Sequence, residues 1–384
     1  MQDYMIEKIR ISGFRKLSSL ELKMKPFMVL IGANGVGKTS FLDSLSLLSQ
    51  SASGRLSGTL SQFGGVANLL TRDKKQNLFL SVDMKVPKQN PLKYNLCIGP
   101  DKTGYAILKE ELSQIREGYS GPFLHISSTE RNITYYDFTQ KKLSNPTWAH
   151  NYSETSLSQT PKMYREPEGL RMILAKTDKY HVLDVGDRAK VKLPQEMKPA
   201  TLPGTEGEDL VPYLYYLREG DPDRFELIID TLKAAFSDFG GLGFPPAAAS
   251  MLTMTWHDCR YAKPFYIHEL SEGMLRFLWL ISLLYSPHLS TITMIDEPEV
   301  SMHPELLNLL VDVMRETSRR TQLVVATHSD RLIRFLKPDE IVVMDIDEDG
   351  AATAAWADSM DLDKWLEEYS LDEIWQMGRM GGRA

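Results

Sequence analysis

One stretch near the start of the chain constrains its fold more than any other. The apolar run FMVLI (27–31) leads directly into GANGVGKTS, which is followed by a helical pattern, FLDSLSLLSQ. Residues Gly32 to Thr39 fit the P-loop pattern G-x-x-x-x-G-K-[ST] and lie between a predicted strand and a predicted helix. In this context a P-loop is a better explanation than a chance glycine-rich turn. Such a loop turns its backbone N–H groups, and the helix N-terminus, toward phosphate oxygens. We therefore predict nucleotide binding.

The motif assigns a role to each polar residue of this loop. Lys38 is expected to reach the β- and γ-phosphates of ATP, and the Thr39 hydroxyl to join the shell of a Mg²⁺ ion. The other residues of the loop expected to contact ATP are Asn34, Gly35, Gly37 and Ser40.

Three later strand-like runs also end in polar residues, namely ITMIDEP, QLVVATHS and EIVVMDID. Their alternation with helical stretches predicts a parallel α/β sheet whose site lies at the strand ends. Asp296 would complete the Mg²⁺ site, and Glu297 would orient or deprotonate a water molecule. His328 would sense the γ-phosphate and help to place that water. The alternatives are a strand-terminal acidic turn and a structural histidine.

Composition limits the classes of protein to consider. The formal charge of −7 gives no global attraction to nucleic acid or to anionic membranes, and 42% hydrophobic with 25% charged residues is typical of a soluble globular protein. Cys97 and Cys259 match no zinc spacing. The N-terminus has no apolar signal region, and the longest apolar run, 277–285, is far short of a bilayer span. We expect a cytoplasmic protein that does not enter the membrane.

The stretch ELSEGMLRFL (269–278) predicts a loop that turns into a helix with a serine cap. The free N–H groups of such a helix start suit an anion, although an ordinary capped core helix has the same pattern. Within it, Leu270 to Met274 resembles the LSGGQ signature of ABC-type ATPases. The P-loop, signature, acidic strand and switch histidine occur here in the family order.

This resemblance implies a homodimer in which two heads sandwich two ATP molecules. Ser271 and Gly273 would then contact the ATP held by the second subunit, while the charge of Glu272 must face away from its phosphates. The Gln loop of such heads has no secure counterpart here, and Gln62 and Gln76 are the candidates.

A finer resemblance is to the RecF/SMC/OLD-like branch, and in particular to stand-alone bacterial ATPases of the AAA family. It is carried by ISGFRK, LSEGMLRFLWL, IDEPEVSMHPELL and TQLVVATHSDRLI. It implies that Arg15 approaches the nucleotide and that His303 and Arg276 lie at the dimer interface. A packing role for His303 and a solvated position for Arg276 are the alternatives.

The expected fold class is α/β: a P-loop NTPase head of the ABC type, with a mainly parallel sheet, an antiparallel β lobe and an inserted lid subdomain. We expect residues 1–82 to form the first part of the head, 83–205 the β lobe and irregular insertion, and 206–384 the rest of the head. The Ser-, Gly- and Gln-rich segment 51–77 predicts loops.

The expected function is ATP hydrolysis with Mg²⁺ in a dimeric switch. The resemblance implies DNA repair or phage defence together with a separately encoded effector protein, because we recognise no second catalytic domain. DNA binding is possible but not indicated by composition, since the basic clusters are expected to be solvated faces; they are Arg72, Lys74, Lys75, Arg319 and Arg320. The alternatives are the nucleotide-binding subunit of a membrane transporter and an ATP-sensing dimer with negligible turnover.

Overall fold

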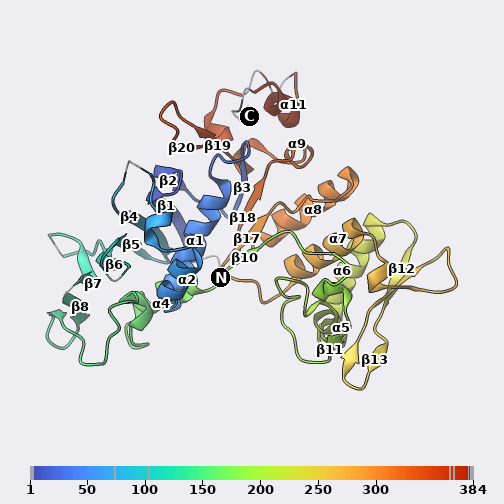
Figure 1. Cartoon of the computed structure of the whole chain (residues 1–384), viewed down its shortest axis with the longest axis horizontal. Helices are drawn as coiled ribbons and strands as arrows, with labels where there is room; N and C mark the ends of the chain where they lie inside the picture. The colour runs from blue at the N-terminus through green and yellow to red at the C-terminus, as the bar shows by residue number, and fades with distance from the viewer. Residues whose placement is uncertain are drawn as a thin grey trace.

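The computed structural model describes residues 4–72, 75–102, 104–118, 120–130, 132–362, 365, 368–378 and 380. Two large sheets dominate the molecule, and helix α1 (Lys38–Ala52) lies between them (Figure 1). Helices α7 (Glu272–Tyr285) and α8 (Pro304–Thr317) cover the opposite side of the central sheet. The central sheet is therefore covered on both faces, as a mainly parallel sheet requires.

The central sheet has six strands in the order β10-β17-β18-β3-β19-β20. All neighbours run parallel except β19 and β20. Its strands are β10 (Thr177–Tyr180), β17 (Ile292–Asp296), β18 (Gln322–Thr327), β3 (Phe27–Ile31), β19 (Ile341–Ile346) and β20 (Ala352–Trp356). Because β17, β18 and β3 are parallel, the residues that follow them meet at one edge of the sheet.

Strand β3 shows why its sequence is apolar throughout. All five of its residues are buried, since the two faces of the sheet pack against different cores. Met28 and Leu30 join the core under α1 and the antiparallel sheet. Phe27, Val29 and Ile31 join the core made with the helices on the other side. Alternating side chains of one strand thus tie the two halves of the molecule together.

The second large sheet is antiparallel and has eight strands, in the order β2-β1-β4-β5-β6-β7-β8-β9. They are β1 (Met5–Phe14), β2 (Leu17–Lys23), β4 (Leu78–Val86), β5 (Gln89–Gly99), β6 (Ala106–Gln114), β7 (Phe123–Thr129), β8 (Asn132–Asp137) and β9 (Lys142–Ser144). Helix α4 (Arg165–Ala175) follows this lobe and packs on α1. The chain then returns to the central sheet as β10.

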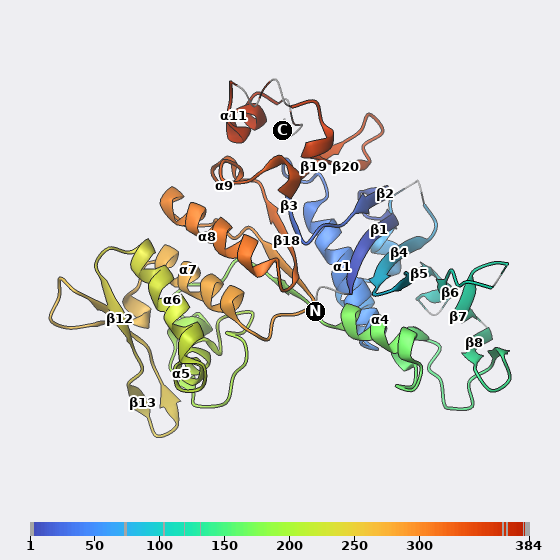
Figure 2. The same cartoon turned by 180° about the vertical axis from the view of Figure 1, so that it is seen from behind.

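A second inserted region separates β10 from the signature helix. Helices α5 (Leu210–Gly220) and α6 (Pro222–Ala235) pack beside α7, and short strands project beyond them on the side away from the antiparallel lobe (Figure 2). The short strands form two three-stranded sheets: β11 (Gln195–Glu196) with β14 (Met251–Leu252) and β13 (Pro246–Ala248), and β12 (Phe239–Gly243) with β15 (Thr255–Asp258) and β16 (Phe265–Tyr266).

The remaining α-helices among the described residues are short. They are α2 (Leu56–Gln62), α3 (Val66–Leu69), α9 (Asp330–Ile333) and α11 (Leu371–Gln376). The first two correct our prediction of loops over 51–77. Leu56, Leu60, Val66 and Leu69 are buried there, so apolar spacing outweighs the glycine and serine content.

The division into parts remains a prediction, but two observations bear on it. The boundary at 82/83 falls inside β4, and β10 from the segment 83–205 belongs to the central sheet.

In the part of the chain that the structure describes, no helix has the length and apolar character needed to cross a bilayer.

Candidate nucleotide site

The phosphate-binding loop joins β3 to α1 at the carboxyl edge of the central sheet. Gly37 precedes the helix with φ +116°, in the left-handed region that a residue with a Cβ rarely adopts. Lys38 Nζ donates to the carbonyl oxygens of Gly32 at 2.5 Å and Ala33 at 2.9 Å, so the lysine folds back over its own loop. Burial lowers the pKa of Lys38, while the charges of Glu297, Asp296 and Glu299 oppose that shift.

The other residues expected to contact ATP differ in exposure. Asn34, Gly35 and Thr39 are exposed, whereas Ser40 is buried at the start of α1. The Thr39 hydroxyl is therefore accessible to a ligand. The assignment of these residues to ATP remains a prediction, with the loop geometry in its favour.

Strands β17 and β18 bring together the carboxylate and the histidine predicted to act in hydrolysis. Glu297 Oε1 lies 2.9 Å from His328 Nδ1, and both side chains are partly exposed. The backbone of Glu297 has φ +53°, which costs energy for a residue other than glycine. Its N–H donates to Ala326 O at 2.8 Å, so the neighbouring strand holds this turn. Glu297 and His328 are thus a preformed pair at the edge where the P-loop begins.

A third carboxylate, Glu299, lies behind this pair, and the sequence analysis did not assign it a role. It is 8% exposed, and its Oε1 accepts a hydrogen bond from the Thr327 hydroxyl. Its Oε2 is buried without a hydrogen-bond partner among the described residues. Burial raises the pKa of Glu299, so its protonated form persists to higher pH than in an ordinary glutamate. The second Glu of IDEPE was the sequence signal for it.

Asp296, at the end of β17, faces two basic side chains that the sequence analysis also missed. Lys179 Nζ lies 3.9 Å and His181 Nδ1 lies 3.8 Å from Asp296 Oδ2. Burial raises the pKa of Asp296, and the charges of Lys179 and His181 act against that rise. Both bases come from β10 or directly after it. Because TDKYH contains no apolar run, the sequence did not predict this strand.

Arg15 does not point freely into the nucleotide site. Its Nη1 lies 2.6 Å from Asp43 Oδ2 on α1, and its guanidinium stacks against the rings of Phe14 and Phe63, each 5.3 Å away. The other oxygen of Asp43 binds Lys179 Nζ at 2.8 Å. Arg15 is therefore linked to Asp296 through Asp43 and Lys179, and direct contact with a nucleotide remains a prediction.

The signature segment begins α7 as predicted. Ser271 is exposed and caps the helix, with its Oγ accepting from Met274 N at 3.3 Å. A Cβ on Gly273 would lie 2.5 Å from the backbone oxygen of Ser301, so only glycine allows the helix to approach that loop. Ser301 itself has φ +62°. The signature helix and the loop after β17 are therefore packed against each other within one chain.

Arg276 connects these elements and is 13% exposed at its side chain. Its Nε donates to Leu183 O at 3.1 Å, and its Nη1 contacts Glu272 Oε2 at 3.3 Å and the Ser301 hydroxyl. Glu272 is thereby turned toward Arg276, and its orientation relative to a phosphate remains a prediction. Arg276 is not the solvated helix residue that we considered as an alternative. A role at a dimer interface remains a prediction.

The other candidates have local roles. His303 caps α8, its Nδ1 accepting from Glu305 N at 3.4 Å, and its place at an interface is untested. Gln62 ends α2, and Gln76 lies before β4. Of the basic clusters, Arg320 donates to Leu284 O at 2.6 Å and Ser286 O at 2.8 Å at the end of α7. Lys74 lies outside the described residues.

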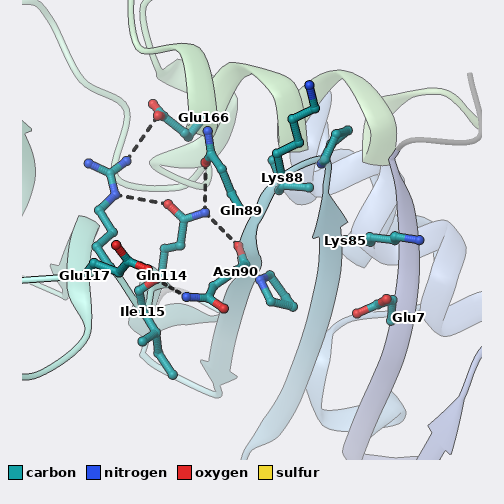
Figure 3. A pocket seen from close by; sticks show the side chains of 13 residues that line it. Glu7, Lys85, Lys88, Gln89, Asn90, Gln114, Ile115, Glu117 and Glu166 are labelled. Atoms are coloured by element: carbon teal, nitrogen blue, oxygen red, sulfur yellow. Dashed lines mark hydrogen bonds and ion pairs between the residues drawn. The ribbon is translucent and has the colours of Figure 1, made fainter.

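One cavity lies apart from these motifs, on the antiparallel lobe. It has a volume of about 830 Å³. Figure 3 shows Glu7, Lys85, Gln114 and Glu166 along the cavity, with Gln114 Nε2 donating to Asn90 O at the start of β5. Charges of both signs line this open cavity, so it selects no ligand class that we can name.

Comparison with known proteins decides the family. Residues 27–334 match the model of the family described as "AAA domain, putative AbiEii toxin, Type IV TA system". The chain belongs to this family of AAA domains. Among curated protein sequences, no relative matches it.

Solved structures that share its fold include two SMC heads. One is the SMC head bound to the C-winged helix domain of ScpA, with 14% identity and a TM-score of 0.55 over 94% of this chain and 99% of that chain. The other, derived from Pyrococcus furiosus, is an SMC head domain with an extended coiled coil bound to the C-terminal domain of ScpA. It has 12% identity and a TM-score of 0.52 over 98% of this chain and 100% of that chain. The predicted α/β fold class is confirmed by these structures, and the predicted AAA family by the family model.

The donor set at the strand edge fits a magnesium nucleotide. The Thr39 hydroxyl and the Asp296 carboxylate are hard oxygen donors of the kind Mg²⁺ prefers. Among the described residues, no group of three or more His, Cys, Asp or Glu side chains is placed to hold a metal ion alone. An ion here would therefore depend on nucleotide phosphates for most of its ligands, as is usual for Mg²⁺.

Proposed function

We propose that this chain binds Mg-ATP and hydrolyses it, as one head of a homodimer that closes around two nucleotides. The observation that carries the proposal is the 2.9 Å contact between Glu297 and His328, at the edge where Lys38 and Asp296 also lie. A carboxylate paired with an imidazole beside a phosphate-binding loop is suited to orienting a water for attack on phosphorus.

Each residue then has a defined task. Lys38 exchanges the carbonyls of its own loop for phosphate oxygens, to which its charge is better matched. Mg²⁺, held by Thr39 and Asp296, would neutralise charge on the phosphates. Glu297 accepts a hydrogen bond from the attacking water, and His328 orients Glu297 and contacts the γ-phosphate.

The dimer is supported by the exposed start of α7. Ser271 and Glu272 are exposed at this helix start, and the helix dipole there favours an anion. A second chain could supply that anion as the γ-phosphate of its own ATP. The proposed biological role is a switch in DNA repair or phage defence, read by a separately encoded effector. It rests on the family resemblance, and turnover measured with and without duplex DNA tests its link to DNA.

The test is the molar mass of the Glu297→Gln protein by light scattering, with and without Mg-ATP. We expect ATP to convert monomers into dimers, because this variant binds ATP without consuming it. Adding Ser271→Arg should abolish the dimer. Ser271→Ala is the matched control, since it also loses the cap, worth about 1 kcal/mol, but adds no bulk.

Three further outcomes bear on the proposal. Lys38→Ala should lose ATP binding, and retained affinity would contradict the role given to the P-loop. Normal hydrolysis by Glu297→Gln would exclude Glu297 as the residue that activates water. A mass that responds neither to ATP nor to Ser271→Arg would contradict the nucleotide sandwich.

A further inference from the structure

The side chain of Glu299 connects the two loops that carry Glu297 and His328. Its Oε1 accepts a hydrogen bond from the hydroxyl of Thr327, the residue that ends β18 directly before His328. The same hydroxyl accepts a hydrogen bond from Ser329 N at 3.0 Å, directly after the histidine. Both chain neighbours of His328 are therefore fixed by a hydroxyl group that Glu299 holds.

We propose that Glu299 is a positioning residue for ATP hydrolysis, which holds the turn at His328 so that the imidazole meets Glu297. The contact that it sets is the 2.9 Å between His328 Nδ1 and Glu297 Oε1. The inference rests on the proposed function and adds to it a residue that acts through the histidine rather than on the nucleotide.

The backbone alone does not fix the histidine. The hydrogen bond from Glu297 N to Ala326 O, at 2.8 Å, joins the same two loops but ends two residues before His328. The His328 side chain is 46% exposed, so packing holds it only in part. Thr327 and Glu299 are 0% and 8% exposed, so water competes little for the hydrogen bond between them. This buried bond is the link nearest to the histidine.

The competing explanation is that Glu299 only stabilises the fold. Its Oε2 argues against this, because that oxygen is buried and has no hydrogen-bond partner among the described residues. A buried acceptor without a partner costs stability, and apolar side chains at positions 299 and 327 would avoid this cost. A glutamate here is therefore a poor choice for stability alone, whereas it suits a residue that has to hold the Thr327 hydroxyl.

The test measures kcat and KM with Mg-ATP, and urea unfolding, for variants of the full chain. Glu299→Met removes the acceptor of the hydrogen bond, and Thr327→Val removes its donor with little change in shape. We expect each variant to lower kcat at least about tenfold with little change in KM, because a misplaced reacting group slows the chemical step. Glu299→Gln keeps an oxygen that accepts from Thr327 and should retain most of the activity.

Combining Glu299→Met with Thr327→Val separates stability from positioning. With both partners apolar, neither is left buried without a partner, so stability should return toward that of the wild type while kcat stays low. Thr293→Val is the matched control for Thr327→Val. Thr293 is also fully buried, and its hydroxyl lies 3.2 Å from that of Thr321, toward the opposite end of β17. This control should lower stability without lowering kcat.

The possible failures are distinguishable. If Glu299 acts through His328, Glu299→Met should not lower the residual kcat of a His328→Ala protein any further, and an equal loss in both backgrounds would overturn the inference. Wild-type kcat in Glu299→Met or Thr327→Val would also overturn it and leave the proposed function standing. A loss in Glu299→Gln as large as in Glu299→Met would assign the effect to charge instead of position. No ATP hydrolysis by the wild type would overturn the proposed function and the inference together.

Discussion

Replacing Arg276 tests whether one side chain joins three loops of the nucleotide site. Its guanidinium contacts Leu183 O after β10, Glu272 on the signature helix, and the Ser301 hydroxyl after β17. Arg276→Met keeps the apolar stem that packs on the protein and removes all of the donors. Glu272→Gln, in contrast, removes only the exposed ion pair.

The expected magnitudes follow from the exposure of each partner. The Arg276 side chain is 13% exposed, and its two bonds to uncharged oxygens are charge-assisted, so together they contribute about 2–4 kcal/mol. Glu272 is 60% exposed, and its ion pair contributes at most about 1 kcal/mol. Arg276→Met should therefore destabilise the protein at least about twice as much as Glu272→Gln.

The assay is urea unfolding of the nucleotide-free protein, with the ATP-dependent dimer measured in parallel. A large loss of monomer stability in Arg276→Met, and a small one in Glu272→Gln, would support the intrachain connection. Equal, small losses in the two variants would refute this reasoning. If the monomer were unaffected and only the dimer were lost, Arg276 would act as the interface cation that the family resemblance implies.

Two further predictions concern other parts of the chain. Burial lowers the pKa of His125 to about 3, whereas in the unfolded chain its pKa is near 6.5. The unfolded chain therefore binds more protons, and the protein loses stability as the pH falls below 6.5. His125→Phe should therefore lose about 2 kcal/mol less than the wild type between pH 7.5 and 5 in urea unfolding, and equal losses would contradict the assignment. Gly273→Ala should cost about 1–3 kcal/mol and weaken the ATP-dependent dimer, because its Cβ would meet Ser301 O at 2.5 Å. Gly220→Ala, with nothing within 4 Å, is the control, and equal stability of the two variants would count against the close approach.

Much of the site could be predicted from the sequence because its residues occur in short, local patterns. The P-loop lies between a strand and a helix, and Asp296, Glu297 and His328 follow apolar runs that only a buried parallel sheet explains. The expected proximity of Glu297 and His328 is found at 2.9 Å. The cap at Ser271 is equally local, since a side chain bonds to a backbone group three residues ahead.

Prediction was weakest where the signal was polar or the contact distant in sequence. The segment 51–77 was expected to form loops because it is rich in serine and glycine, and this composition outweighed the spacing of its leucines, which the structure buries. Strand β10 was missed because TDKYH lacks an apolar run, and with it Lys179 and His181. No sequence pattern predicts that Asp43, on a different element, would bind both Arg15 and Lys179.

The sequence by itself determined which chemical groups the candidate site contains. The glycine-rich loop, the two carboxylates and the histidine each directly follow a strand in the sequence. Parallel strands bring the residues that follow them to one edge of the sheet. Only the tertiary structure decided which groups surround that chemistry. The charge balance at Asp296, the buried Glu299 and the connection made by Arg276 depend on side chains that meet across the fold, at distances and exposures that spacing along the chain does not encode.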